Sequence, residues 1–233
     1  TYVTKPAFHK QHRNTLVRVE QEERKARAIN RGSEGGPTLT SNFAVNATRS
    51  PAFAMWVKLD VNNPSNRYLV EKENGIFIQV LSTTEFAIRL YQDGSNHRTF
   101  VYTIPGTHVH TNWNNYIIDI KTFGSDPVVK INNVTLSKAS GPTDSGSPSA
   151  YINLTNISMM GLAWTSVGFN GALSNFMIFE RTDATALDTA KIFADRDGTT
   201  AGMGSLTHFF SLGETDHTKR DKFNDPLPEG FAF

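Results

Sequence analysis

The sequence predicts an all-β sandwich of about ten short strands, preceded by a segment of different character. From about residue 38 onward, apolar and polar residues alternate, as in FAMWVKLDV, where Phe53, Met55 and Val57 share one face. Clusters of Asn, Asp, Ser and Gly separate these alternating stretches, which is typical of strands joined by turns. With 233 residues, 38% hydrophobic residues and 16 Phe, the chain can build a substantial core between two sheets.

Each predicted strand is a stretch of alternating or apolar residues between turn signals. The dipeptide Asn132-Asn133 suits a type I′ hairpin, because asparagine tolerates the positive φ that both central positions need. The stretches are 53–61, 67–73, 75–81, 85–91, 98–104, 113–123, 127–136, 151–164 and 169–181.

The stretch FNGALSNFMIFER, residues 169–181, breaks the strand pattern. Leu173 and Phe176 are separated by an odd number of positions, so a regular strand would point them to opposite faces. Either a β-bulge resets the alternation or the strand is buried on both faces; we favour the bulge. Gly171 would allow a bulge or a close approach of another backbone.

Two further elements follow this strand. TDATALDTAKIFADRDG predicts one short helix, which Thr182 or Asp183 would cap and Gly198 would end. SLTHFFSLGETD then predicts one more strand. These patterns divide the chain into an arm, residues 1–37, a β-sandwich, residues 38–213, and a polar tail, residues 214–233.

The N-terminal arm carries the basic charge of the chain. Residues 1–35 hold eight Lys and Arg against four Asp and Glu, whereas the whole chain has a net charge of only +1. NTLVRVEQEERKARAINRG predicts a helix that begins at Asn14 or Thr15 and ends at Gly32. Its apolar stripe is thin, so we expect the arm to need a neighbour for stability. The partner-contacting residues we predict are Leu16, Val17, Arg18, Arg24 and Arg27.

The order of these pieces resembles the laminin-G-like, concanavalin A-like jelly roll. The matching pieces are FAMWVKLD, WNNYIIDI, the VVKINNVTL hairpin and FNGALSNFMIFER with a helix directly after it. The resemblance covers roughly residues 38–197 and excludes the arm and the tail. It implies two packed antiparallel sheets, one of which can be covered on its outer face by loops or a helix.

Enzymes of this kind of fold are known, but their residue patterns are missing here. The glucanase-type cluster Glu-x-Asp-x-x-Glu is absent, as are the Gln-x-His and Tyr-x-x-x-Tyr strands of lyases. Glu71 and Glu73 would share a strand face, yet they lie beside a turn and we interpret them as a solvated edge. We therefore expect no enzymatic activity.

Metal-binding patterns are equally weak, and we expect neither a metal nor another cofactor. There is no cysteine, which excludes thiolate sites. His108 and His110 would project to one side of an extended segment without an evident third ligand, so an exposed loop is favoured over a metal pair. The resemblance implies a calcium rim in some relatives. Acidic residues that could serve it are Asp93, Asp126 and Asp144.

Three tryptophans could stack on sugars if they were exposed. Trp56 and Trp113 occupy positions that belong to the core in the resembling family, so we expect core roles for both. Trp164 lies near a loop and its role stays open.

The first functional hypothesis is a non-enzymatic virion protein. Residues 1–10 lack the apolar stretch of a secretion signal, and no run of 18 apolar residues predicts a membrane span. A β-sandwich with a basic arm resembles phage capsid decoration (cement) proteins or fibres, whose arm grips the major capsid protein or another virion protein. That resemblance implies location in a virion assembled in the host cytoplasm and attachment in symmetric copies. The copies would multiply weak contacts, and a homotrimer is our guess. Nucleic acid is a less favoured partner, because acidic residues alternate with the basic ones.

The alternative hypothesis is a carbohydrate-binding module that recognises a surface glycan. Its candidate residues are Tyr91, Asn96, Trp164 and Asn170. A polysaccharide-degrading enzyme is a third hypothesis, kept only because proteins that the fold resembles include enzymes.

Overall fold

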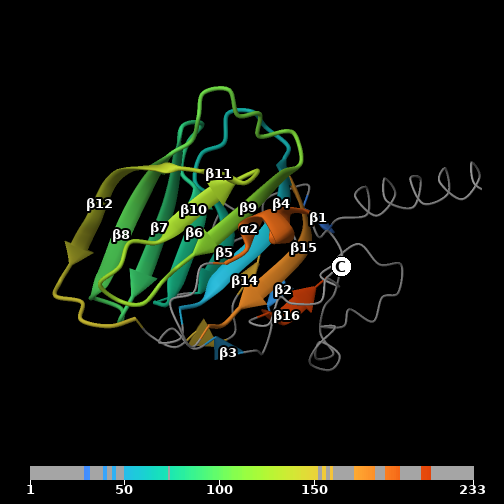
Figure 1. The fold of residues 1–233 in the computed structure, drawn as a ribbon. Helices are drawn as coiled ribbons and strands as arrows, with labels where there is room; N and C mark the ends of the chain where they lie inside the picture. The colour runs from blue at the N-terminus through green and yellow to red at the C-terminus, as the bar shows by residue number, and fades with distance from the viewer. Residues whose placement is uncertain are drawn as a thin grey trace, which may run out of the picture.

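A computed structural model shows two antiparallel sheets packed face to face (Figure 1). It describes residues 50–72, 74–151, 171–181, 187–194 and 206–210, and the short strand segments 29–31, 39–40, 44–45, 154–155 and 158–159. The predicted all-β sandwich is therefore confirmed, and so is a short helix after the last long strand. The helix begins at Thr189, with Leu187 and Asp188 outside it, so the prediction that Thr182 or Asp183 caps it is wrong; Gly198 lies outside the described residues. No helix in the described part of the chain is long and apolar enough to cross a membrane.

Sheet A has seven strands in the order β1-β15-β4-β9-β10-β11, with β16 also paired to β15. Its strands are β1 (Ile29–Arg31), β4 (Ala52–Leu59), β9 (Asn114–Asp119), β10 (Val128–Ile131), β11 (Val134–Thr135), β15 (Gly171–Phe179) and β16 (Leu206–Phe210). The last of these lies within the predicted strand at residues 205–216.

Sheet B also has seven strands, in the order β12-β8-β7-β6-β5-β14-β2. Its strands are β2 (Leu39–Thr40), β5 (Arg67–Lys72), β6 (Ile76–Val80), β7 (Glu85–Tyr91), β8 (His97–Thr103), β12 (Ser137–Ser145) and β14 (Ser158–Met159). A separate pair joins β3 (Ala44–Val45) to β13 (Leu154–Thr155).

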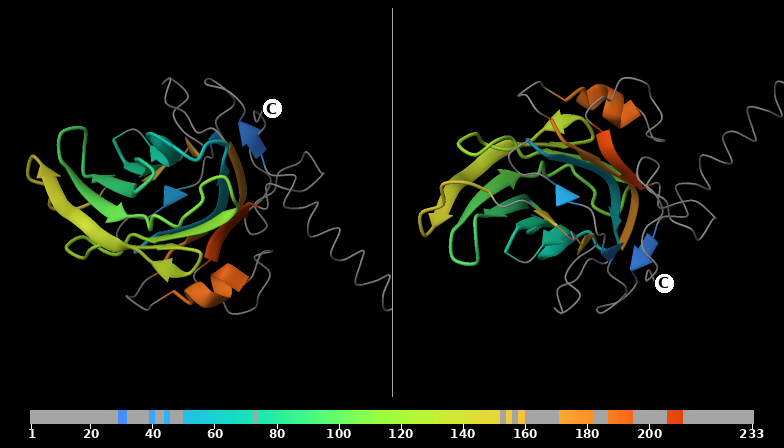
Figure 2. Two further views of the ribbon diagram at one scale, coloured as in Figure 1. Left: turned by 90° about the horizontal axis from the view of Figure 1, so that it is seen from above. Right: turned by 90° about the horizontal axis from the view of Figure 1, so that it is seen from below.

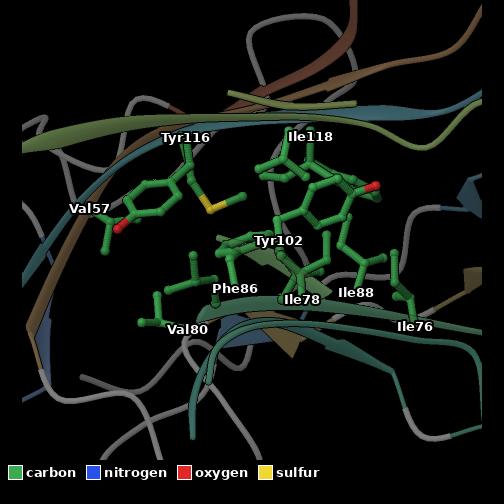
Figure 3. Close-up of a cluster of buried hydrophobic side chains, with 14 of the residues drawn as sticks. Val57, Ile76, Ile78, Val80, Phe86, Ile88, Tyr102, Tyr116 and Ile118 are labelled. Carbon is green, nitrogen blue, oxygen red and sulfur yellow. The ribbon is translucent and has the colours of Figure 1, made fainter. Parts of the chain in front are cut away.

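The core lies between the sheets and follows the alternation seen in the sequence. Figure 3 shows Val57, Tyr116 and Ile118 of sheet A pointing toward Ile78 and Phe86 of sheet B. The largest fully buried side chains are Tyr116, Phe53, Phe86, Phe100, Phe176, Phe179, Met55 and Leu59. Burial of this apolar surface is the main stabilising contribution to the sandwich.

Strand β15 contains the bulge that its sequence suggested. The pairing of β15 with β4 shifts between Ser174 and Met177, and Asn175 has φ 48°, a conformation that asparagine tolerates better than most residues. The shift brings Leu173 and Phe176 onto the same, inner face. The alternative is also confirmed, because Met177 and Phe179 are buried on the opposite face.

The helix α2 (Thr189–Ala194) covers the outer face of sheet A (Figure 2). Ile192 and Leu187 pack there against the outward side chains of β4, β9 and β15, which include Met177 and Phe179. Trp56 lies on the same outer face, so the expectation that it belongs to the inter-sheet core is wrong. Its sequence parity directs it outward, where the helix partly covers it.

Gly171 opens β15 at a point where two backbones approach closely. It has φ +153°, and a Cβ placed there would lie 2.1 Å from the carbonyl oxygen of Lys58 on β4. The close approach considered from the sequence is therefore present at Gly171, while the bulge itself lies at Asn175.

The hairpin between β10 and β11 has the predicted turn. Asn132 and Asn133 have φ values of 51° and 64°, as a type I′ turn requires. The amide of Asn132 also bonds the side chain of Asn114 at 2.8 Å, which ties the turn to β9.

The end of the predicted arm helix is wrong. Ile29–Arg31 form strand β1 on the edge of β15, where Ile29 pairs with Leu173. An open strand edge leaves backbone groups without partners, and pairing with β15 overrides a weak helical preference in these three residues. Residues 1–28 and 32–37 of the predicted arm lie outside the described residues.

Candidate functional site

The outer face of sheet B gathers aromatic and charged side chains on its four central strands. In β6, Ile76, Ile78 and Val80 point into the core, so Phe77 and Gln79 point outward. The same alternation in β7 turns Phe86, Ile88 and Leu90 inward and leaves Ala87, Arg89 and Tyr91 on the outer face. In β8 it leaves His97, Thr99 and Val101 there.

Four rings form a diagonal row across neighbouring strands on this face. We call Tyr68 of β5, Phe77 of β6, Tyr91 of β7 and His97 of β8 the ring row. Successive ring centroids lie 5.6, 5.5 and 4.8 Å apart along it. Tyr91 is 7% exposed, while the other three rings are only partly buried. The row is therefore a continuous aromatic strip with a partly open surface.

Arg89 lies beside the ring row, in the corner between Phe77 and Tyr91. It pairs in register with Phe77 on one side and with Thr99 on the other. Its Nε donates to Thr99 Oγ1 at 3.3 Å, and one terminal nitrogen donates to the Tyr91 hydroxyl at 3.5 Å. These two contacts orient a partly buried guanidinium at the edge of the aromatic strip.

The electrostatics of the face follow from partial burial around one cation. Burial raises the pKa of Tyr68, and the Arg89 charge opposes that rise without reversing it. Burial also lowers the pKa of His97, and the nearby Arg89 charge lowers it further. Because both shifts favour the neutral form, Tyr68 and His97 are uncharged near neutral pH, and Arg89 supplies the positive charge beside them.

Glu71 contradicts the interpretation of residues 71–73 as a solvated edge. It is only 4% exposed, and β5 is not an edge strand: it lies between β6 and β14, and Ser158 of β14 pairs with Glu71. A strand more than 80 residues away in the sequence thus covers what looked like an edge. Glu73 lies outside the described residues, so the suggested acidic pair stays undescribed.

The four predicted glycan-binding residues do not form one described site. Tyr91 belongs to the ring row, whereas Asn96 lies in the β7–β8 turn with its side chain engaged. The amide of Asn96 donates to the Asp93 carboxylate at 2.9 Å, and its oxygen accepts from the backbone N–H of Ser147 at 2.8 Å. Trp164 and Asn170 lie outside the described residues.

Sequence reasoning missed the other members of this face. The sequence analysis did not propose Tyr68, Phe77, Arg89 or His97. Strand parity could have placed Phe77, Arg89 and His97 on the outer face, but not Tyr68. In IFIQV and EFAIRLY, the pattern that buries Ile76 and Ile88 places Phe77 and Arg89 outward. A large aromatic residue on the outward parity of a strand was the available signal.

The two histidines do come together, but in a packed loop. The rings of His108 and His110 lie 4.5 Å apart between centroids, and His110 is 2% exposed. His108 Nε2 lies 3.4 Å from the Tyr116 hydroxyl, and His110 Nε2 lies 3.1 Å from the Thr83 carbonyl oxygen. The expectation of an exposed loop is wrong for His110. The loop lies between strands of the two sheets, and its packing buries that ring.

The three acids suggested for a calcium rim are each engaged within the chain. Asp93 accepts from the backbone N–H groups of Ser95 and Asn96, Asp126 pairs with Lys138, and Asp144 pairs with Arg98 at 2.6 Å. In the described part of the chain, no group of three or more metal-ligating side chains could hold an ion.

Of the remaining predicted residues, the structure describes Trp113 but not the arm residues. Trp113, expected in the core, is partly buried in the loop before β9 and does not belong to the buried cluster between the sheets. The arm residues Leu16, Val17, Arg18, Arg24 and Arg27 lie outside the described residues, so their role stays a prediction.

Comparison with known proteins finds likenesses in structure alone. No family model matches the chain, and no curated protein matches its sequence. A Bacteroides ovatus protein assigned to carbohydrate binding matches 77% of this chain and 52% of its own length, with 10% identity and a TM-score of 0.48. This chain thus corresponds to about half of that protein.

Two further similar structures are nearer in size to this chain. The CBM40 domain of the Ruminococcus gnavus IT-sialidase has 9% identity and a TM-score of 0.47, covering 72% of this chain and 95% of that domain. The SAP-like pentraxin of Limulus polyphemus has 12% identity and a TM-score of 0.43, covering 73% and 82%. Scores this low carry no argument about function, and the site must be judged on its own geometry.

Proposed function

We propose that the chain is a non-catalytic carbohydrate-binding domain whose binding surface is the outer face of sheet B. The observation that carries this proposal is the ring row, Tyr68-Phe77-Tyr91-His97, with Arg89 beside it. A sugar ring presents C–H groups that pack on aromatic faces and hydroxyls that need hydrogen-bond partners. A strip that alternates rings with polar groups offers both.

The two outer faces of the sandwich differ in a way that supports this choice. On sheet A the outward apolar side chains are covered by Leu187 and Ile192 beside α2 and within it. On sheet B the described residues include no helix over the ring row, and three of its four rings are partly exposed. Aromatic side chains that remain partly exposed on one sheet face are a common mark of a ligand surface.

The polar groups near the row suit hydroxyl recognition. Gln79 and Thr99 lie on the outward parity of β6 and β8, next to the rings. The Thr99 hydroxyl can donate and accept hydrogen bonds, whereas Oε1 of Gln79 is buried, which leaves the amide N–H groups of Gln79 as donors. Arg89 adds donors that are already oriented by Thr99 and Tyr91.

Saccharide binding by the full chain tests the proposal. A panel of immobilised neutral and acidic oligosaccharides would be screened, and the affinity of any ligand measured for wild type, Phe77→Ala and Tyr68→Ala. We expect each variant to weaken binding about ten-fold, the effect of losing a contact worth roughly 1.4 kcal/mol. Phe193→Ala, which removes a partly buried ring from the other side of the molecule, is the matched control and should bind like wild type. The proposal fails if no saccharide binds, or if Phe193→Ala weakens binding as much as Phe77→Ala does.

The virion hypothesis concerns a different part of the chain. It depends on the predicted arm, residues 1–37, of which the structure describes only Ile29–Arg31, and it stays a prediction. The two proposals are compatible, because an arm attached to a particle would display the carbohydrate-binding face on the surface of that particle.

A further inference from the structure

We propose that the ring row selects saccharides that carry a carboxylate, with Arg89 as the residue that pairs with the acid. This inference rests on the proposed carbohydrate-binding function and narrows it to one ligand class. It concerns uronic and other sugar acids as opposed to neutral saccharides.

The first argument is that Arg89 differs from the other arginines whose contacts are known. Arg98 pairs with Asp144, and Arg181 pairs with Asp119, so both hold a carboxylate. Arg89 donates hydrogen bonds to two hydroxyl groups, those of Thr99 and Tyr91, and no described acid lies within ion-pair distance of it. An arginine side chain has five N–H donors, so most of its donor capacity remains for a ligand.

The second argument is that this guanidinium is already oriented. Arg89 lies on β7, a central strand of sheet B, and its two hydroxyl contacts come from β7 itself and from β8. A planar guanidinium held in place matches a carboxylate with two parallel hydrogen bonds and little further loss of side-chain entropy. Partial burial strengthens the pairing, because the local dielectric constant is lower than that of water.

The third argument is the distribution of charge around the ring row. Glu71 lies in register with Phe77, on the opposite side of that ring from Arg89. The face therefore has its cation on one side of Phe77 and its acid on the other. Glu71 is only 4% exposed, so Arg89 is the charged group beside Phe77 that a stacked sugar can reach, and the sugar can direct a carboxylate to it. With one partly exposed cation beside Phe77, this arrangement favours a saccharide with one acid group at a defined position.

The test compares each acidic sugar with its own neutral ester. Trigalacturonic acid, a hyaluronan tetrasaccharide and an N-acetylneuraminic acid trisaccharide would be titrated into the full chain beside their methyl esters, at low and high salt. We expect at least one acid to bind ten-fold or more tightly than its ester, with the ratio falling as salt rises.

Two variants of Arg89 and one control then locate the preference. Arg89→Gln should bring the acid-to-ester ratio close to one, and Arg89→Lys should retain a smaller preference, since it keeps the charge but loses the planar fork. Lys138→Gln removes one positive charge from the edge strand β12 of the same sheet and should leave the ratio unchanged. Circular dichroism of each variant checks the fold.

The outcomes separate this inference from the proposed function. If every acid binds as its ester does, the inference is wrong while the carbohydrate-binding proposal stands. If no acid, ester or neutral oligosaccharide binds at all, both are wrong. Tighter binding of a sulfated disaccharide than of any carboxylated one, or loss of the ratio in Lys138→Gln, would also overturn the assignment to a carboxylate at Arg89.

Discussion

The indole ring of Trp56 stacks on the ring of Phe193, with centroids 5.7 Å apart and planes at 27°. Trp56 points outward from β4, the central strand of sheet A, and Phe193 belongs to the helix that follows β15. Through this contact and its other apolar contacts, α2 covers part of the outer face of sheet A. The outer face of sheet B carries the ring row, and no described helix lies over it. We therefore assign binding to that face.

Replacing Gly171 by alanine should destabilise the sandwich strongly. The new Cβ would lie 2.1 Å from the Lys58 carbonyl oxygen and 2.9 Å from the Leu59 Cα, both backbone atoms that cannot move aside cheaply. We expect the free energy of unfolding in urea to fall by about 3 kcal/mol or more. Gly106→Ala is the matched control, since nothing lies within 4 Å of its Cβ position. Equal stability of the two variants would contradict the close approach of β15 and β4.

The buried ion pair between Arg181 and Asp119 should contribute more to stability than the exposed pairs do. Both side chains are less than a tenth exposed, and Arg181 also donates to the Ser50 carbonyl at 3.4 Å. Arg181→Met would leave Asp119 buried, with Lys121 as its one remaining ion-pair partner among the described residues, so we expect a loss of about 3 kcal/mol in chemical denaturation.

The control for this variant is a more exposed ion pair, between β12 and the loop before β10. Lys138→Gln breaks the pair with Asp126, whose side chain is half exposed, and should change stability by less than about 1 kcal/mol. A cost for Arg181→Met no larger than for Lys138→Gln would show that the buried pair contributes nothing specific.

The free energy of unfolding should fall as the pH is lowered from about 6.5 to 4. In this range His108 and His110 take up protons less readily in the folded chain than in the unfolded chain. Burial, aided by the neighbouring His110, lowers the pKa of His108 to about 4, and burial lowers the pKa of His110 as well. The unfolded chain takes up these protons near pH 6.5, so protonation favours the unfolded state between about pH 6.5 and 4. For His108 the effect is about 2 to 3 kcal/mol.

Urea denaturation at pH 8, 6, 5 and 4 measures this dependence. His108→Asn removes one titrating group, so its curve should be flatter between pH 6.5 and 4 than that of wild type. Parallel curves for the two proteins would mean that His108 titrates normally in the folded chain.

Much of the fold could be predicted because local rules decided it. Alternation placed Ile76 and Ile78 in the core, and the Asn132-Asn133 dipeptide specified its own turn. The features that could not be predicted depend on pairing between distant segments. Glu71 looked exposed because the sequence does not show that β14 pairs beside it, and Ile29 looked helical because its partner, Leu173, lies far along the chain.

The candidate site was predictable only in part for the same reason. Strand parity could have placed Phe77, Arg89 and Tyr91 on outward positions, and Tyr91 was indeed selected. The bulge in β5 between Tyr68 and Val70 resets the alternation, so only the three-dimensional register shows that Tyr68 reaches the ring of Phe77. A row that runs diagonally across four strands has no linear signature.

Deleting residues 1–28 should separate the arm from the body of the protein. The described sandwich begins with β1 at Ile29, so we expect the truncated chain to keep its thermal transition and its saccharide binding. If the arm attaches the protein to a capsid, the truncated chain should fail to co-sediment with particles that retain the full chain. A truncated chain that no longer folds would show instead that the arm belongs to the body.

The most direct test of the central claim is to see which aromatic side chains a bound saccharide touches. In an NMR titration with the tightest ligand of the panel, the ring resonances of Tyr68, Phe77 and His97 should shift with a common dissociation constant. The resonances of Phe193 and Trp56 should stay in place. Shifts confined to Phe193 and Trp56, with none in the ring row, would contradict the assignment of binding to the outer face of sheet B.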